Sequence, residues 1–174
     1  MTATSNHFMM QALNNAWANS TLYKAILPMS DEDVAANRPS FFGSIIRTLN
    51  HIYEVDLYYA DALKAAGKGR QIFQRDDVKS VAALGALQAD VDLELAMFCK
   101  DIQPDVLVSN CQIERKDGLV DERVDWVLLH LFQHQIHHRG QIHAMLSHAG
   151  IEPPQLDEFF LENGRIPSVK PYWS

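Results

Sequence analysis

Apolar residues recur at helical spacing along four long stretches of this 174-residue chain. In residues 8–27 they are Leu13, Ala16, Trp17, Leu22, Tyr23 and Ile26. Positions three or four residues apart lie on one face of a helix, so this stretch is expected to form an amphipathic helix. Pro28 comes next and marks the end of the helix, because proline cannot continue the backbone hydrogen bonding.

The same spacing predicts two further long helices, over residues 41–66 and 78–102. The apolar face of the first carries Phe41, Ile45, Leu49, Ile52, Tyr59 and Leu63. Ser40 is expected to cap its start and Gly67 and Gly69 to end it, since serine hydroxyls cap helices and glycines stop them. The apolar face of the second carries Val81, Leu84, Leu87, Val91, Leu95 and Phe98. Residues 30–33 are expected to open only a short helical turn.

The helical period fades between residues 106 and 124. Two short runs, residues 106–108 and 111–113, precede the dipeptide Asp117-Gly118, which favours a tight turn between paired strands. These residues are expected to form a small β-hairpin or an extended connection. The helical period returns over residues 122–149, where Gly150 and the following prolines end it. Residues 156–162 are expected to add a short fifth helix.

Four amphipathic helices of about twenty residues predict an all-α fold, a four-helix bundle, in a single domain over residues 1–174. A chain of 174 residues is long enough to bury a sizeable core without disulfides or a structural metal. No internal repeat or low-complexity segment interrupts the pattern.

Charge and composition narrow the classes of function. The net charge is −7, and the 15 Lys and Arg residues form no basic stripe that could follow a phosphate backbone, so no nucleic-acid partner is expected. No apolar run approaches the 18 or so residues of a membrane span, and residues 1–10 lack a leader pattern. Cys99 and Cys111 are expected to be free thiols in a reducing compartment, which makes the cytoplasm the expected location.

The most informative chemistry lies in the last predicted helix. Six of the eight histidines fall in residues 130–148: His130, His134, His137, His138, His143 and His148. His138 lies near the centre of the apolar stripe with His134 beside it, and their four-residue spacing lets both rings reach one metal ion. His130, His137 and His148 lie on the flank of the stripe and His143 on the opposite side, so they are less suited as ligands.

Two interpretations of this pair remain open on spacing alone. Neutral imidazoles in a core can be hydrogen-bonded core residues, or they can share a cation that satisfies both acceptor nitrogens. A third ligand would have to come from another helix, and His51 is the interior histidine available, since His7 lies in a terminus expected to fray. His51 lies at the edge of its apolar face, where a half-exposed boundary histidine is the favoured reading from that helix alone.

Two segments of the chain resemble the DinB/YfiT-like family. They are the run Leu128-Leu-His130-Leu-Phe-Gln-His134-Gln-Ile-His-His138-Arg-Gly-Gln141-Ile and, upstream, Leu49-Asn-His51-Ile. The family signature is a histidine on helix two and a His-x-x-x-His-Arg-Gly-Gln run on helix four. The resemblance extends over essentially the whole chain in helix order and length. It implies an up-down-down-up four-helix bundle with a divalent metal, often zinc or nickel, held by three histidines, which map onto His51, His134 and His138.

Other residues of the signature have physical interpretations of their own. Arg139 points away from the metal and is expected to anchor a carboxylate or a helix end. Gly140 is expected to allow close approach of another helix. Gln141, Asp56 and Tyr58 are candidates to orient a ligand or a bound water, against the alternative of ordinary packing or solvation.

Three imidazoles leave coordination positions open, which favours a catalytic site over a closed structural one. The resemblance implies a small-molecule enzyme, either a hydrolase using an activated water or an S-transferase that binds a low-molecular-weight thiol, since relatives include thiol-dependent S-transferases and isomerases. No Glu follows the first ligand as in His-Glu-x-x-His, so a metalloprotease is not expected. The alternative is a non-catalytic metal-binding bundle with a structural, dimerisation or stress-related role. Homodimerisation is implied by the resemblance.

Overall fold

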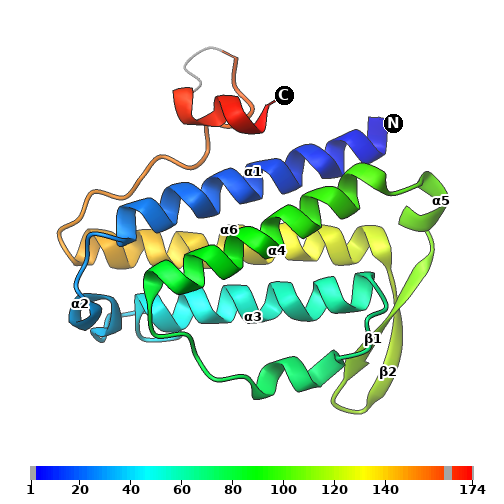
Figure 1. Cartoon of the computed structure of the whole chain (residues 1–174), viewed down its shortest axis with the longest axis horizontal. Helices are drawn as coiled ribbons and strands as arrows, with labels where there is room; N and C mark the ends of the chain where they lie inside the picture. Colours follow the sequence, from blue (N-terminus) through cyan, green and yellow to red (C-terminus); the bar gives the residue numbers. More distant parts are fainter. Residues whose placement is uncertain (1–2, 163–165, 174) are drawn as a thin grey trace.

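The computed structural model describes residues 3–162 and 166–173, and it is mostly helical with a small two-stranded sheet (Figure 1). Its four long helices are α1 (Ala3–Ile26), α3 (Ile45–Leu63), α4 (Val81–Asp101) and α6 (Val124–His148). They lie side by side, with α1 and α6 running in one direction and α3 and α4 in the other (Figure 1). All four match helices predicted from apolar spacing, with shifted ends.

The shorter elements connect and cover these helices. They are α2 (Asp31–Ala35), the 3-10 helix η1 (Gly69–Gln74), α5 (Pro104–Leu107), strands β1 (Asn110–Arg115) and β2 (Gly118–Arg123), and the 3-10 helix η2 (Pro167–Tyr172). The strands pair antiparallel, with Asn110 opposite Arg123 and Arg115 opposite Gly118. The hairpin and its turn next to Gly118 were predicted, and the backbone φ of 125° there suits glycine. Among the described residues, no helix has the length and apolarity needed to cross a membrane.

The apolar faces of the four helices meet in a common interior. At one end, Val55, Leu95 and Leu128 belong to a single cluster of buried side chains from α3, α4 and α6. At the other end, Leu22 of α1 and Ile142 of α6 belong to a second cluster. Burial of these side chains is the main stabilising contribution to the arrangement.

The start of α3 differs from the sequence prediction. Ser44, rather than Ser40, caps this helix, because its hydroxyl accepts the backbone N–H of Arg47. Phe41 is therefore outside the helix and 85% exposed, not on its buried face. The preceding turn uses Gly43, whose φ is 76°.

Three other predictions were wrong in detail. Residues 106–108 do not form a strand, because the helix α5 that follows Gln103 includes Val106 and Leu107. Residues 156–162 are not helical, and the C-terminal segment instead forms η2. Gly140 was expected to allow close approach of another helix, but it faces open space, since a Cβ there would meet no atom within 4 Å. The close approach is at Gly85 instead, where α4 packs on α1 and a Cβ would lie 2.9 Å from Cδ1 of Tyr23.

Candidate metal centre

His51 of α3 and His134 and His138 of α6 come together between their two helices. Nε2 of His51 lies 3.0 Å from Nε2 of His134. One candidate ligand nitrogen from each of the three rings lies within 4.8 Å of the others. The four-residue spacing brings the two α6 rings within 4.3 Å of each other, measured between centroids. Packing of α3 against α6 supplies the third ring, and we call this group the three-histidine site.

Burial keeps the three rings neutral. It lowers the pKa of His134 to about 3, with a further contribution from the neighbouring histidines. It also lowers the pKa of His51 to about 4 and that of His138 below its ordinary value. The neutral imidazole is the form that binds metals. In a tetrahedral Zn²⁺ site with Zn–N distances of about 2.0–2.1 Å, two ligand nitrogens would be about 3.3 Å apart. The Nε2 atoms of His51 and His134 are 3.0 Å apart, close to this separation, and the set of three ligand nitrogens lies within 4.8 Å.

Gln141 fixes the tautomer of His138. Its Oε1 lies 2.9 Å from Nδ1 of His138, and because an amide oxygen only accepts, Nδ1 carries the hydrogen. The Nε2 lone pair of His138 is thereby left available to a metal. The amide nitrogen of Gln141 in turn lies within hydrogen-bond distance, 3.1 Å, of Nε2 of His137. The Nδ1 atom of His134 is buried without a hydrogen-bond partner among the described residues.

Phe42 closes one side of the three-histidine site. Its ring centroid lies 4.2 Å from that of His51, with the planes 31° apart, and 5.5 Å from that of His138. Phe42 was not predicted to belong to the site, because the apolar spacing placed residue 42 inside a helix. The signal that could have revealed it is Gly43, which allows the turn before the Ser44 cap.

The remaining sequence candidates, Tyr58 and Asp56, make no hydrogen bond to the three rings within the described residues. The Tyr58 hydroxyl donates to the backbone oxygen of Glu114, and the Tyr58 side chain lines a cavity together with His134. Asp56 accepts hydrogen bonds from Gln88 and Gln135, and within the described residues it is hydrogen-bonded to no histidine.

The histidines outside the site also follow the sequence reasoning. His143 lies 2.6 Å, through Nε2, from the backbone oxygen of Pro154, and His148 is exposed. The ring of His130 is 6.0 Å from that of His134 and packs against Tyr59. None of these belongs to the three-histidine site.

A network of buried polar side chains joins all four long helices beside the three-histidine site. Its members are Asn15, Asn19, Asp56, Gln88, Asp92, Gln135 and Arg139. Nη1 of Arg139 donates to side-chain oxygens of Asn15, Asn19 and Gln135. Asp92 accepts from Asn15, Asn19 and Gln88. This network was not predicted from the sequence. Its signal is three pairs of polar residues, each spaced four residues apart within an otherwise apolar helix.

The charges of this buried polar network nearly balance. Burial raises the pKa of Asp92 to about 6, while hydrogen bonds from Asn19 and Gln88 oppose the shift. Burial and the charge of Asp92 raise the pKa of Asp56 well above its usual range. Burial lowers the pKa of Arg139 only to about 10, so it stays charged. At neutral pH the Arg139 guanidinium and the Asp92 carboxylate therefore carry opposite charges, and burial disfavours the charged form of Asp56.

The buried polar network also determines how α6 is rotated. Gln135 and Arg139 directly follow His134 and His138 in the sequence. Neighbouring residues on a helix point about 100° apart, so anchoring the first pair in the interior turns the histidines toward α3. Arg139 was expected to bind a carboxylate or a helix end, and its hydrogen bonds instead go to amide oxygens.

The fold and the site define a mostly helical protein in which two neighbouring helices present three histidines to one point. The model of the DinB family matches residues 1–169, and the chain therefore belongs to that family. Protein DinB of Bacillus subtilis (strain 168) is 26% identical over 143 residues, which are 78% of this chain and 82% of the relative. The family membership expected from the histidine motif is confirmed.

Proposed function

We propose that this protein is a mononuclear metal-dependent enzyme acting on a small molecule, as a thiol-dependent S-transferase or a hydrolase. His51, His134 and His138 would hold a divalent ion, zinc or nickel, within an up-down-down-up four-helix bundle in the cytoplasm. When bound, such an ion would act as a Lewis acid toward a water or a thiol in an open coordination position. Membership of the DinB family, which is associated with metal binding, supports this proposal.

The convergence of three neutral imidazoles from two helices is the observation that carries the proposal. Closed structural zinc sites have four protein ligands, whereas catalytic sites have three and leave one position for water or substrate. Within the described ranges, no fourth His, Cys, Asp or Glu joins the group. Phe42 shields one side from water, and a cavity adjoins His134 on another. This arrangement favours an open site.

Metal analysis of the purified protein and two variants tests the ligand set. We expect about one divalent ion per chain in the unaltered protein and loss of that ion in His51→Ala. His148→Ala is the matched control, because His148 is an exposed histidine outside the site. Retention of the full metal content by His51→Ala would contradict the proposed centre.

Activity assays then separate the two reactions. The metal-loaded protein is offered glutathione, bacillithiol or mycothiol together with a model electrophile, and separately a panel of activated esters. Transfer with one thiol that disappears in His51→Ala supports an S-transferase. Ester cleavage with the same dependence supports a hydrolase.

A non-catalytic role is the second candidate, and one observation favours it. An ion bound by His51 and the two α6 histidines would cross-link α3 and α6, as a structural metal does. Thermal melting with and without a chelator distinguishes the two roles. A structural ion would raise the midpoint by many degrees, whereas a weakly bound catalytic ion would raise it modestly.

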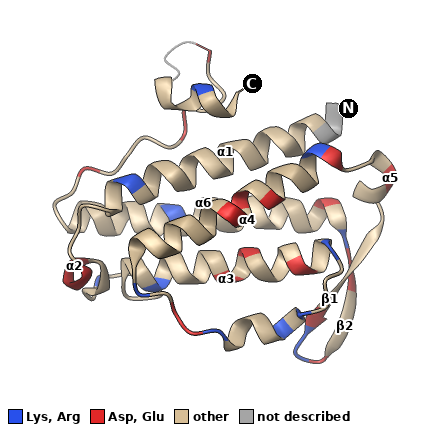
Figure 2. Cartoon of the chain, viewed as in Figure 1, with Lys and Arg blue, Asp and Glu red and all other residues tan. Residues whose placement is uncertain are grey.

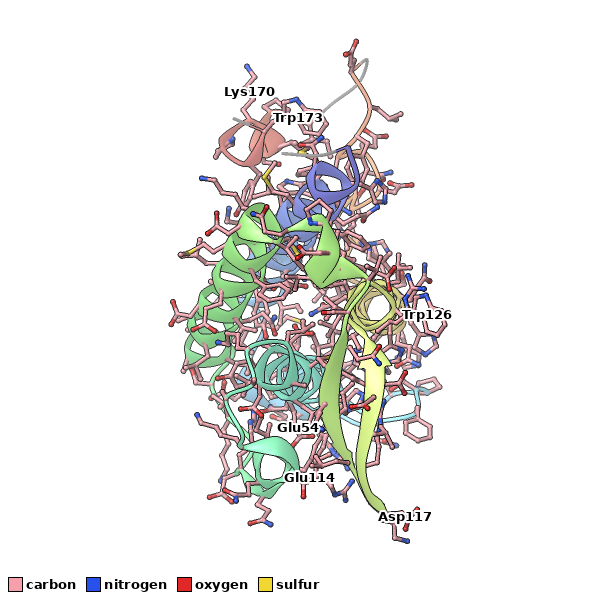
Figure 3. The ribbon with its side chains drawn as sticks, turned by 90° about the vertical axis from the view of Figure 1, so that its right-hand side faces the viewer. Glu54, Glu114, Asp117, Trp126, Lys170 and Trp173 are labelled. Carbon is pink, nitrogen blue, oxygen red and sulfur yellow. The ribbon has the colours of Figure 1, made fainter. Side chains whose placement is uncertain are left out.

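Homodimerisation is likewise proposed. Trp126, Leu129 and Ile136 are exposed apolar residues on α6, and Figure 3 shows Trp126 at the outer surface of that helix. A second copy of the chain would cover such side chains. Light scattering should give a dimer mass for the unaltered protein and a monomer mass for Ile136→Glu. A monomer mass for the unaltered protein would contradict the proposal.

A further inference from the structure

A cavity of about 210 Å³ adjoins the three-histidine site. Its lining comes from α3, η1, β1 and α6: Val55, Tyr58, Tyr59, Arg70, Phe73, Arg115, His130 and His134. Figure 3 shows the hairpin that carries β1 standing beside α3 and α6. His134 belongs both to this lining and to the three-histidine site, where its Nε2 is 3.0 Å from His51. A molecule in the cavity would therefore touch the candidate metal centre.

The cavity is positively charged in an acidic protein. Arg70 and Arg115 line it and no Asp or Glu does, although the chain carries a net charge of −7. Figure 2 shows basic residues on both η1 and the hairpin, at the same end of the molecule. Two guanidinium groups around one small cavity attract an anion and raise its local concentration.

Both arginines keep donors for a ligand. In the part of the chain that the structure describes, the Arg70 guanidinium has no carboxylate within 4.0 Å and lies 5.9 Å from the Phe73 ring centroid. Nη1 of Arg115 donates to the Tyr59 hydroxyl at 3.1 Å, and its Nη2 is 3.8 Å from Glu122. Because a guanidinium has five N–H donors, these contacts leave others for a carboxylate.

Local packing determines where Arg70 lies. The backbone N–H of Arg70 donates to Oε2 of Glu114, 2.7 Å away, which ties η1 to β1. This approach requires Gly69, where φ is 52° and a Cβ would overlap the Glu114 carboxylate. Figure 3 shows Glu114 near η1. The Glu114 carboxylate is thus engaged by the backbone N–H of Arg70.

Size and shape restrict the ligand. The rings of Tyr58, Tyr59 and Phe73 pack edge to face or tilted, with centroids 4.8–5.0 Å apart, and form an apolar wall. Sites for drug-sized ligands span about 300–1,000 Å³, so a cavity of about 210 Å³ suits a smaller molecule.

From this geometry we propose that the cavity binds the carboxylate of a small anionic substrate through Arg115 and Arg70. The apolar part of the substrate would pack against the aromatic wall, and its reacting end would extend toward His134. Arginine pairs with carboxylates through two parallel hydrogen bonds, which would fix the orientation of the substrate. The inference rests on the proposed function, because it assigns the substrate class of that same site.

A pair of matched thiols tests the inference. The protein is loaded with Co²⁺ and titrated with 3-mercaptopropionate or with the uncharged 3-mercaptopropionamide, and binding is followed by the visible and near-ultraviolet absorption of the ion. We expect the carboxylate probe to bind at least about tenfold more tightly than the amide, because charge-assisted hydrogen bonds favour it. Arg115→Gln and Arg70→Gln should each remove most of this preference. Lys100→Gln, an exposed charge at the end of α4, should leave it unchanged.

The outcomes separate this inference from the proposed function. If both thiols bind alike and the arginine variants change nothing, the cavity assignment is wrong while the metal site stands. A preference that persists in both arginine variants reflects chelation by the probe and also overturns the assignment. If metal analysis finds no Co²⁺ in the protein, both proposals fail. If Arg115→Gln does not fold, Arg70→Gln decides, because the Arg70 side chain makes no ion pair within the described residues.

Discussion

Replacing Arg139 by methionine should weaken the fold more than any replacement of a surface arginine. Arg139 is 5% exposed and supplies the positive charge of the buried polar network. Its Nη1 donates to three side-chain oxygens from α1 and α6. Methionine would fill a similar volume but leave these acceptors without a donor and Asp92 without a compensating charge.

The expected loss of stability follows from those contacts. A buried acceptor left without a donor costs about 1–3 kcal/mol, and Arg139 serves three such acceptors. Its removal also takes away the favourable charge interaction with Asp92, with which Arg139 makes no direct ion pair within the described residues. These contributions overlap, because the same side chain makes them, so we expect a loss of about 3–5 kcal/mol at pH 8. That loss would be a large part of the 5–15 kcal/mol by which a typical domain is stable.

The size of this effect should depend on pH. Burial raises the pKa of Asp92 from 3.8 to about 6, so between these values the folded state binds more protons than the unfolded state. Stability due to this group therefore falls as the pH rises from about 4 to about 6. Asp92 is charged, and attracts Arg139, only above about pH 6. Loss of Arg139 should then cost more at pH 8 than at pH 5.

Urea unfolding followed by circular dichroism, with a chelator present, measures this prediction at both pH values. Arg123→Met is the control, because Arg123 pairs with Asp125 at the surface, where such pairs contribute about 0–1 kcal/mol. A loss below about 1 kcal/mol for Arg139→Met at pH 8 would refute the reasoning. So would a loss at pH 5 as large as that at pH 8.

The remaining predictions concern helix packing and the metal centre. Gly85→Ala should lower the melting temperature at a cost of about 1–3 kcal/mol, because the new Cβ would lie 2.9 Å from Tyr23. Gly140→Ala should stabilise the folded state by up to about 1 kcal/mol, because its Cβ would meet no atom within 4 Å. Equal effects of the two substitutions would contradict the packing of α4 on α1. Gln141→Leu should lower Zn²⁺ affinity about 10–100-fold in a chelator competition, with the exposed Gln133→Leu unchanged, because it removes a ligand's hydrogen-bond acceptor. Burial lowers the pKa values of all three site histidines below 6.5, so Zn²⁺ affinity should change little between pH 7 and pH 8; a steep rise over that range would show that the rings are protonated at pH 7.

Local sequence signals predicted most of the helices and the hairpin. The four long helices follow from apolar spacing, and the strands turn next to Gly118 as expected from Asp117-Gly118. The start of α3 was predicted wrongly, because Ser40 was expected to cap the helix. The structure shows that Ser44 is the cap, since its hydroxyl accepts the N–H three residues ahead.

The site was predicted only in part for a physical reason. The spacing of His134 and His138 is a property of one helix, so the sequence shows it directly. His51 lies 83 residues from His134, and from α3 alone it was more readily interpreted as a boundary residue. The family resemblance, rather than the local pattern, pointed to it as the third member.

By itself, the sequence determined which faces of the helices are buried and which histidines share a turn, because these depend on spacing within a single element. Only the tertiary structure decided which turn of α3 faces which turn of α6, and therefore that Phe42 covers His51 and that two arginines line a cavity beside His134. Such contacts depend on the relative rotation and translation of packed helices, to which distant side chains such as Asp92 and Arg139 contribute together. No short stretch of sequence contains that information.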